Sequence, residues 1–242
     1  MQSANPTLES AYSAVLESLN RASGEASRPV PRLVAVSKTR TPDEVAALHS
    51  LGQRDFGENY VQEAAAKMDA LAGLGIEWHL IGHLQSNKAR EAAARFDWVQ
   101  TVDRARLAEA LGAARPADRP PLNVLIQVNV DGEASKSGCA PGDIDALADA
   151  IAGQPRLRLR GLMAIPAPSD DPAVRRAAFA AMRRLFENLK QRFAAIDSLS
   201  MGMSDDFDVA IAEGATMVRI GTALFGPRDR PRTIGPAPHT YK

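Results

Sequence analysis

The chain has 242 residues, of which 45% are hydrophobic, so it is long and apolar enough to bury a sizeable core. Its 29 lysines and arginines are balanced by 29 aspartates and glutamates, which argues against nucleic acid or an anionic membrane as a partner. The single cysteine, Cys139, excludes an intrachain disulfide and a cysteine-rich metal site.

The sequence contains no recognisable targeting or membrane segment. Residues 1–6 lack a basic region followed by an apolar run, and no stretch approaches the ~20 apolar residues of a membrane span. We therefore expect a cytoplasmic protein without membrane contact. A (β/α)8 barrel needs roughly 250 residues, so residues 1–242 suit one such domain with nothing appended.

Apolar periodicity predicts a leading helix followed by strands that alternate with helices. The leading helix covers residues 7–26, because Leu8, Tyr12, Val15 and Leu19 recur at helical spacing. Short apolar runs between turn residues predict strands at 33–38, 76–81, 96–102, 122–130, 157–165 and 217–220. Two less apolar segments, 53–59 and 196–201, are predicted to be the second and seventh strands. Helices are predicted at 42–51, 61–68, from 85 onward, near 107–111, 142–152, 171–193, 205–213 and 221–225.

This alternation predicts a parallel sheet covered by helices, in the α/β class. Eight strand–helix units in this length favour a closed barrel over an open doubly wound sheet. Thr41 and Asp103 are expected to cap the helices that follow them. The tail from Gly226 is rich in proline and arginine, and we expect it to lie loosely over the surface.

Lys38 follows the uninterrupted apolar run Leu33–Val36, which is typical of a strand buried on both faces. In parallel α/β folds, ligands bind at the carboxyl ends of such strands. A partly desolvated lysine there would have a lowered pKa and could form a Schiff base with an aldehyde. The alternative is a surface lysine that only happens to follow a strand.

Other reactive side chains also follow predicted strands, and in a barrel these ends share one face. They are Asn59, His83 and Asn87, Met163 to Pro166, Ser200 to Ser204, and Arg219 to Thr222. Arg219 interrupts an apolar strand, which suggests either a fixed cation directed into a site or a rim residue in a salt bridge.

The last two loops favour a phosphate site. Ser204 and the pair Gly221–Thr222 stand where a loop enters a helix, and barrels commonly bind phosphate after strands seven and eight. The alternative is that Ser204 only caps its own helix and Gly221 only makes a tight turn.

Other chemistries find less support. The glycine-rich dinucleotide motif and the P-loop pattern are absent from the sequence. His79 and His83 have the spacing of two metal ligands on a helix, but their neighbours predict a strand, so we predict no metal site. Alternation in residues 156–160 indicates a strand with one solvated face rather than a nucleic-acid patch.

Taken together, five segments resemble the pyridoxal phosphate (PLP) homeostasis protein family, also called the PLP-binding or proline synthase co-transcribed family. They are AVSKT at 35–39, FGENYVQE at 56–63, WHLIGHLQSNK at 78–88, LSMGMSDD at 199–206 and VRIGTALFG at 218–226. The resemblance extends over residues 8–229. It implies a single TIM barrel of PLP fold type III, similar to the N-terminal barrel of alanine racemase, with an extra N-terminal helix.

The resemblance also implies a set of cofactor-binding residues: Lys38, Asn59, His83, Met163, Ser200, Ser204, Arg219, Gly221 and Thr222. Lys38 would hold PLP as a Schiff base, and Arg219 would face the pyridine nitrogen. The hydroxyl groups and the glycine after strands seven and eight would bind the phosphate, with Ser200 as a helper. The remaining three residues would line the pocket.

The expected function is PLP homeostasis, in which the protein carries the cofactor without robust catalysis and is not an enzyme. A charged arginine opposite the ring nitrogen disfavours the proton that makes PLP an electron sink. PLP-dependent apo-enzymes are the expected recipients, and the sequence does not distinguish a monomer from a weak dimer. The alternatives are an amino-acid racemase of low activity and a barrel for another phosphorylated metabolite; Lys38 argues against the latter.

Overall fold

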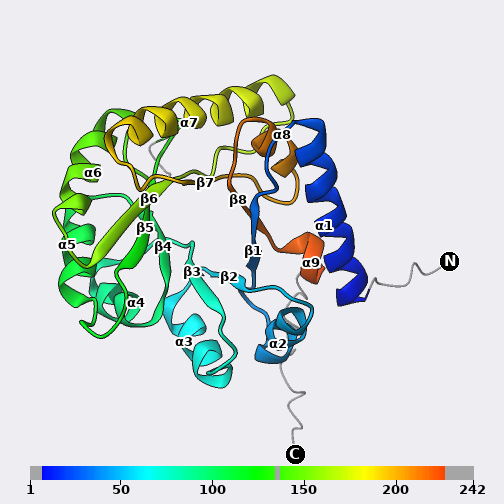
Figure 1. Cartoon of the computed structure of the whole chain (residues 1–242), viewed down its shortest axis with the longest axis horizontal. Helices are drawn as coiled ribbons and strands as arrows, with labels where there is room; N and C mark the ends of the chain where they lie inside the picture. The colour runs from blue at the N-terminus through cyan, green and yellow to red at the C-terminus, as the bar shows by residue number, and fades with distance from the viewer. Residues whose placement is uncertain (1–6, 134–136, 227–242) are drawn as a thin grey trace, which may run out of the picture.

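Eight short segments form parallel strands, and the last strand pairs with the first, so the sheet closes into a barrel (Figure 1). The computed structural model describes residues 7–133 and 137–226. The strands are β1 (Arg32–Val36), β2 (Asp55–Glu58), β3 (Glu77–Leu80), β4 (Trp98–Val102), β5 (Leu122–Gln127), β6 (Leu157–Met163), β7 (Ser198–Ser200) and β8 (Met217–Ile220). Each strand lies beside its sequence neighbours, in the order β1 to β8.

Helices surround the barrel, and α1 lies beside α8 and α9 at the point where the barrel closes (Figure 1). They are α1 (Leu8–Glu25), α2 (Pro42–Ser50), α3 (Val61–Ala70), α4 (Ala89–Arg95), α5 (Ala105–Ala114), α6 (Ile144–Ala152), α7 (Pro172–Arg192), α8 (Phe207–Ala212) and α9 (Thr222–Phe225). Short 3-10 turns, η1 (Ser86–Lys88) and η2 (Pro141–Asp143), precede α4 and α6. None of the helices in residues 7–133 and 137–226 combines the length and the hydropathy that a transmembrane helix requires.

The predicted closed barrel with a leading helix is confirmed, and the differences lie at strand ends. The strand predicted at 33–38 ends at Val36, because Thr39 takes a left-handed conformation with φ of 66° that turns the chain. The strand predicted at 122–130 ends at Gln127; beyond it Val128 forms only an isolated bridge with Cys139. The expectation for the tail from Gly226 concerns residues 227–242, which lie outside the described residues.

The two predicted helix caps have different outcomes. Thr41 caps α2 as expected: its Oγ1 accepts the Glu44 N–H at 3.2 Å, and the Glu44 carboxylate accepts the Thr41 N–H at 2.7 Å. The prediction for Asp103 is wrong, because Arg104 occupies the N-cap position of α5 and makes no side-chain cap bond. Asp103 instead forms an ion pair with Arg104.

The barrel has an apolar exterior layer and a partly polar interior. Most buried apolar side chains pack between the sheet and the helices. Inside the barrel, a small cluster consists of Trp98, Leu125, Met163 and Met217. Buried polar side chains, among them His79, Gln100 and Arg219, fill space beside it.

Gly161 allows β6 and β7 to approach closely. It has a φ of 150°, and a Cβ atom there would lie 1.8 Å from the carbonyl oxygen of Ser198. The register between β5 and β6 shifts at the same level, between Val124 and Leu125. Both the backbone conformation and the contact therefore require glycine at this position.

We expect Gly161→Ala to lower the free energy of unfolding by about 2–4 kcal/mol, because it combines backbone strain with overlap against Ser198. Urea unfolding measures this effect. Gly24→Ala in α1 is the control, because a Cβ atom there meets nothing within 4 Å, and we expect unchanged or slightly higher stability. Equal urea midpoints for the two variants would contradict the conclusion that position 161 requires glycine.

Candidate functional site

The sequence-predicted residues gather at the carboxyl ends of the strands. Lys38 lies two residues beyond β1, Asn59 directly after β2, and His83 shortly after β3. Because all eight strands are parallel and the barrel is closed, these residues share one face with the ends of β6, β7 and β8.

Alternation along β1 places Lys38 on the interior side of the barrel. Val34 faces the interior, where a Cβ atom at Gly57 would lie 3.0 Å from its Cγ1 atom. The Ser37 N–H continues the ladder by donating to the Gly57 carbonyl at 3.0 Å, so the pattern extends one residue past the strand. Lys38, four residues after Val34, therefore projects to the same side and is half-buried.

Arg219 is the buried cation of this face and is only 3% exposed. Its Nη1 donates to Ser200 Oγ at 2.6 Å, and its Nη2 donates to the Ala164 carbonyl at 2.8 Å. The alternative of a rim residue is wrong, because the side chain lies inside the barrel. Burial lowers the pKa of Arg219 to about 10, against the attraction of Asp206, so the group remains a cation at neutral pH.

A chain of hydrogen bonds continues from Arg219 through the barrel interior. Ser200 Oγ donates to Gln100 Oε1 at 2.7 Å. The amide nitrogen of Gln100 lies 3.0 Å from His79 Nδ1, and His79 Nε2 lies 2.9 Å from Asp55 Oδ1. We call these five residues the interior chain.

The donors in the interior chain all point the same way. Because Gln100 Oε1 accepts from Ser200, its amide N–H group is the donor toward His79. Nδ1 of His79 is then an acceptor, and its Nε2–H donates to Asp55. The interior chain therefore runs from the buried Arg219 cation to the Asp55 carboxylate.

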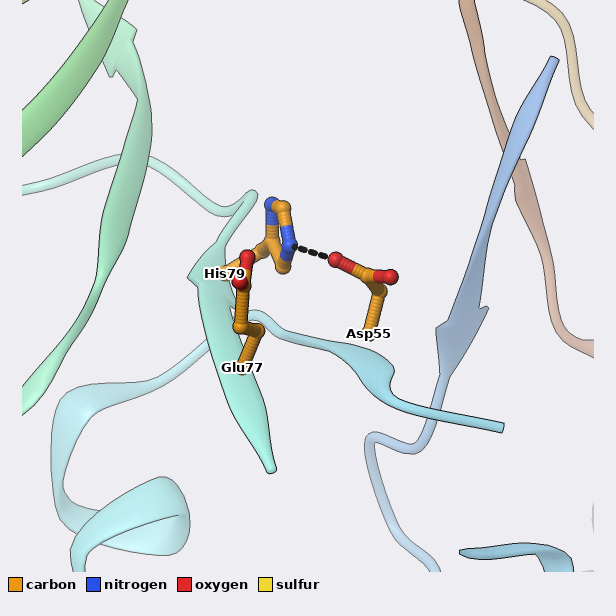
Figure 2. A group of neighbouring side chains, drawn as sticks. All are labelled: Asp55, Glu77 and His79. Carbon is orange, nitrogen blue, oxygen red and sulfur yellow. Dashed lines mark hydrogen bonds and ion pairs between the residues drawn. The ribbon is translucent and has the colours of Figure 1, made fainter. Parts of the chain in front are cut away.

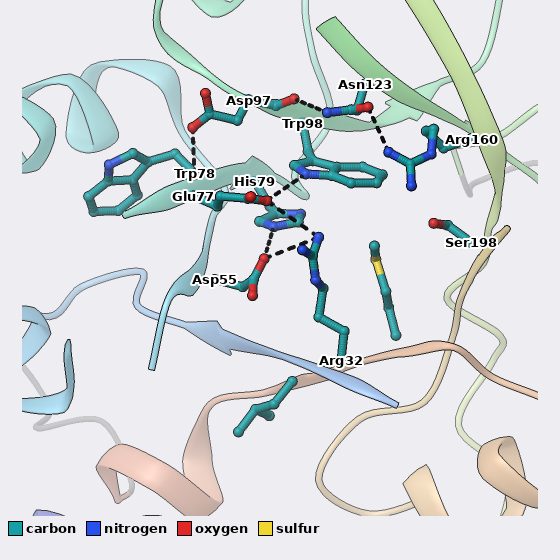
Figure 3. A network of polar contacts seen from close by, with 12 residues as sticks. Arg32, Asp55, Glu77, Trp78, His79, Asp97, Trp98, Asn123, Arg160 and Ser198 are labelled. Carbon is teal, nitrogen blue, oxygen red and sulfur yellow. Dashed lines mark hydrogen bonds and ion pairs between the residues drawn. The ribbon is translucent and has the colours of Figure 1, made fainter. Parts of the chain in front are cut away.

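The chain ends in an ion-pair network at the opposite, amino-terminal end of the barrel. There Asp55, Glu77 and His79 place ligand atoms within 4.8 Å of one another, a spacing that a metal ion could use (Figure 2). However, the Arg32 guanidinium lies 3.4 Å from both carboxylates, and Trp98 Nε1 donates to Glu77 at 3.1 Å (Figure 3). Because a cation already neutralises the acids, we assign this group as structural.

His79 and His83 do not converge. The His79 ring is buried and stacks on Trp98 with ring centroids 5.3 Å apart. The His83 ring lies 3.3 Å from Ser137 Oγ and 4.0 Å from an Asp103 oxygen. The strand interpretation of this segment is confirmed by β3.

The loop after β7 is fixed by Gly202 and Asp206. Gly202 has a φ of 91°, and its carbonyl accepts the Arg219 N–H at 3.0 Å. Asp206 Oδ1 accepts the Met203 N–H at 2.6 Å, and Asp206 occupies the N-cap position of α8. The alternative that Ser204 caps its own helix is therefore wrong.

The loop after β8 packs against the end of β1. Gly221 occupies the N-cap position of α9 and Thr222 is its first residue. A Cβ atom at Gly221 would lie 3.2 Å from the Cβ atom of Val36, two residues before Lys38. The glycine therefore brings the expected phosphate loop close to the lysine.

A cavity of about 280 Å³ opens on the same face. It is lined by Asn59, Ile81, Gly82, His83, Gln127, Val128, Asn129, Ser137 and Ile165. Asn59 and His83 thus line the same cavity, whereas Met163 lies in the interior cluster with Trp98. Among the described residues, Gln127 Oε1 and Asn129 Oδ1 are buried acceptors without a hydrogen-bond partner.

The sequence did not indicate Gln100, Gln127 or Asn129 as residues of the site. Ser200 makes contacts that differ from its predicted role. Ser200 was expected to help bind phosphate, but its Oγ bridges Arg219 and Gln100 and is fully buried. A signal for Gln100 and Gln127 was available, since each is a polar residue within an apolar strand.

The comparisons agree with this architecture. The family model for the alanine racemase N-terminal domain matches residues 12–229. The pyridoxal phosphate homeostasis protein of Pseudomonas aeruginosa is 58% identical over 197 residues, covering 81% of this chain and 84% of that protein. The Escherichia coli protein of the same name is 54% identical over 200 residues, with 81% and 86% covered.

Solved structures give the same fold. PipY of Synechococcus elongatus, solved with PLP bound, is 35% identical with a TM-score of 0.80, covering 91% of this chain and all of that one. Alanine racemase from Corynebacterium glutamicum, at 20% identity and a TM-score of 0.68, shares the fold over 89% of this chain and 62% of its own. With these relatives matching over most of its length, the chain belongs to the pyridoxal phosphate homeostasis protein family.

Proposed function

We propose that this chain binds PLP as a Schiff base on Lys38 and serves PLP homeostasis as a carrier rather than as an efficient enzyme. The observation that carries the proposal is an interior lysine two residues beyond the end of β1, together with a buried, fixed arginine on the neighbouring strand β8. The two strands are paired, with Val34 opposite Arg219. The names of the relatives and the PLP-bound PipY structure support the same function.

The residues present fit the chemistry of PLP. Lys38 offers an amine, Arg219 offers a cation for the pyridine nitrogen, and the loops after β7 and β8 offer backbone N–H groups for a phosphate. The unpartnered acceptors of Gln127 and Asn129 mark a polar cavity wall that accommodates a ligand with hydrogen-bond donors. When bound, the cofactor supplies an aldehyde that condenses with amines and a ring that withdraws electrons when protonated.

Within this proposal, each predicted site residue keeps a defined role. Ser204, Gly221 and Thr222 bind the phosphate, and Asn59 and His83 line the cavity beside the ring. Ser200 acts on Arg219 rather than on the phosphate. Met163 supports the floor of the site from the interior cluster.

The interior chain explains weak catalysis in this proposal. Arg219 stays charged at neutral pH and presents N–H groups, so it favours an unprotonated ring nitrogen and limits electron withdrawal. Tyr60, the tyrosine nearest to a strand end in the described residues, is 65% exposed and occupies the N-cap position of α3. Its position provides no desolvated base for proton transfer.

The proposal includes a cytoplasmic location and PLP-dependent apo-enzymes as recipients of the cofactor. The single cysteine, Cys139, is compatible with a reducing compartment. Its burial raises the pKa of the thiol to about 11, so it is a poor nucleophile at neutral pH. The lysine is therefore the reactive group that the proposal uses.

Incubation with PLP should give a yellow protein whose visible band is bleached by borohydride, with the pyridoxyl adduct on Lys38. Lys38→Ala should lose this band, because it removes the amine that forms the Schiff base. Lys190→Ala, at an exposed position on α7, should behave as the wild type. A wild-type protein that stays colourless, or an adduct on another lysine, would overturn the assignment.

The PLP-loaded protein should exchange the α-proton of L- and D-alanine in deuterated water no faster than free PLP does. The charged Arg219 and the exposed Tyr60 give the physical reason. Proton NMR follows the loss of the α-proton signal. Fast exchange with both enantiomers would establish the alternative, a racemase of low activity.

Gln100→Leu should weaken PLP binding by about tenfold, because it removes the partner of the Ser200 hydroxyl and of His79 Nδ1 and so loosens the group that holds Arg219. Titration followed by visible absorbance measures this affinity. Gln53→Leu is the matched control, because Gln53 is also buried and donates to the Leu33 and Asp55 carbonyls at 2.7 Å. Equal losses of affinity in both variants would show that general destabilisation, not the interior chain, is responsible.

A further inference from the structure

A second buried polar cluster lies on the other side of β1, behind Lys38. It consists of Glu58, the last residue of β2, and of Glu63 and Lys67 on α3. Glu58 is fully buried, and the side chain of Lys67 is 5% exposed. We call these three residues the outer cluster, because they lie between the sheet and α3.

Lys67 uses its ammonium group completely within this cluster. Its Nζ donates to the Ser37 carbonyl at 2.7 Å and to one carboxylate oxygen each of Glu58 and Glu63 at 2.8 Å. An ammonium group has three N–H donors, so these bonds occupy all of them. Lys67 is therefore a structural cation, distinct from the interior-facing Lys38.

The outer cluster holds the backbone on both sides of Lys38. On the preceding residue, Ser37 Oγ donates to Glu58 Oε1 at 2.6 Å, and the Ser37 carbonyl accepts from Lys67. On the following residue, the Thr39 N–H donates to Glu63 Oε1 at 2.5 Å. The peptide groups that flank Lys38 are thus tied to one ion-paired group.

The conformation of Thr39 makes this support necessary. Its φ of 66° is unfavourable for a β-branched residue and persists only where its surroundings enforce it. The bond from Thr39 to Glu63, itself paired with Lys67, provides that constraint. The turn sets the direction in which the chain leaves β1 and so the starting direction of the Lys38 side chain.

The electrostatics of the cluster depend on all three members. Burial raises the pKa of Glu58, while the hydrogen bonds from Lys67 and Ser37 oppose this rise. Glu58 Oε1 accepts both of these hydrogen bonds, so the two partners counteract the effect of burial on the pKa only in part. Loss of one member leaves a buried charge or acceptor unpaired, which loosens the others.

We propose that Glu58, Glu63 and Lys67 are positioning residues for Lys38: they fix the backbone around it so that its amine meets the aldehyde of PLP. This inference depends on the proposed function, in which Lys38 forms the Schiff base. A displacement of about 1 Å in a reacting group is enough to slow a reaction strongly. The outer cluster therefore controls Schiff base formation without touching the cofactor.

Variants of Glu63 test this role, because its side chain is 29% exposed and its replacement spares the core. Glu63→Ala removes both anchors, to Thr39 and to Lys67, whereas Glu63→Gln keeps an acceptor for the Thr39 N–H. We expect Schiff base formation with PLP, followed by visible absorbance, to slow about tenfold in Glu63→Ala and less in Glu63→Gln.

Two controls separate positioning from general damage. Asp69→Ala, on the same helix, removes an ion pair with Arg95 at 2.7 Å and should react as the wild type does. Pyridoxine 5′-phosphate lacks the aldehyde, so its affinity should be unchanged within about twofold in every variant, because its binding does not need Lys38 to be aligned.

The outcomes distinguish this inference from the proposed function. A wild-type protein that forms no Schiff base would overturn the function. A wild-type protein that forms it, with Glu63→Ala reacting at the same rate, would overturn only the positioning role. Equal slowing in Asp69→Ala, or a matching loss of pyridoxine 5′-phosphate affinity, would also contradict it. If Glu63→Ala fails to fold, the same comparisons with Glu63→Gln decide.

Discussion

The buried guanidinium of Arg219 is the constraint on which the interior of this barrel depends. A cation removed from water costs several kcal/mol unless its N–H groups find acceptors. Ser200 and the Ala164 carbonyl supply them, and Gln100, His79 and Asp55 extend the contact to the far end of the barrel. An apolar interior could not hold this charge, which accounts for the polar residues within β2, β3, β4 and β7.

Polar groups lie on both sides of β1 near Lys38. On its interior side, pairing with β8 places Lys38 and Arg219 at the same end of neighbouring strands. On its outer side, Glu58, Glu63 and Lys67 hold the peptide groups before and after Lys38. A short, well-anchored strand end thus gives a long, flexible side chain a defined starting point.

The sequence was sufficient to predict the eight-stranded barrel, because most strands are short apolar runs and the regular alternation with helices also locates β2 and β7, which are less apolar. It also singled out Lys38 and Arg219, since a charge that ends or interrupts an apolar strand is conspicuous. The contacts between Gln100 and Ser200, and between Lys67 and Ser37, could not be predicted, because they join residues whose proximity depends on strand register and helix packing. Asp103 shows the limit of local rules, since its ion pair with Arg104 replaces the cap that its position suggests.

We propose that a fixed, charged Arg219 keeps the ring nitrogen of PLP unprotonated, so that the protein carries the cofactor instead of using it. The most direct measurement is the nitrogen NMR shift of PLP labelled with ¹⁵N at the ring position and bound to the protein. We predict the shift of an unprotonated pyridine that does not respond to pH across the neutral range. A shift typical of a protonated pyridinium in the wild-type protein would contradict the account.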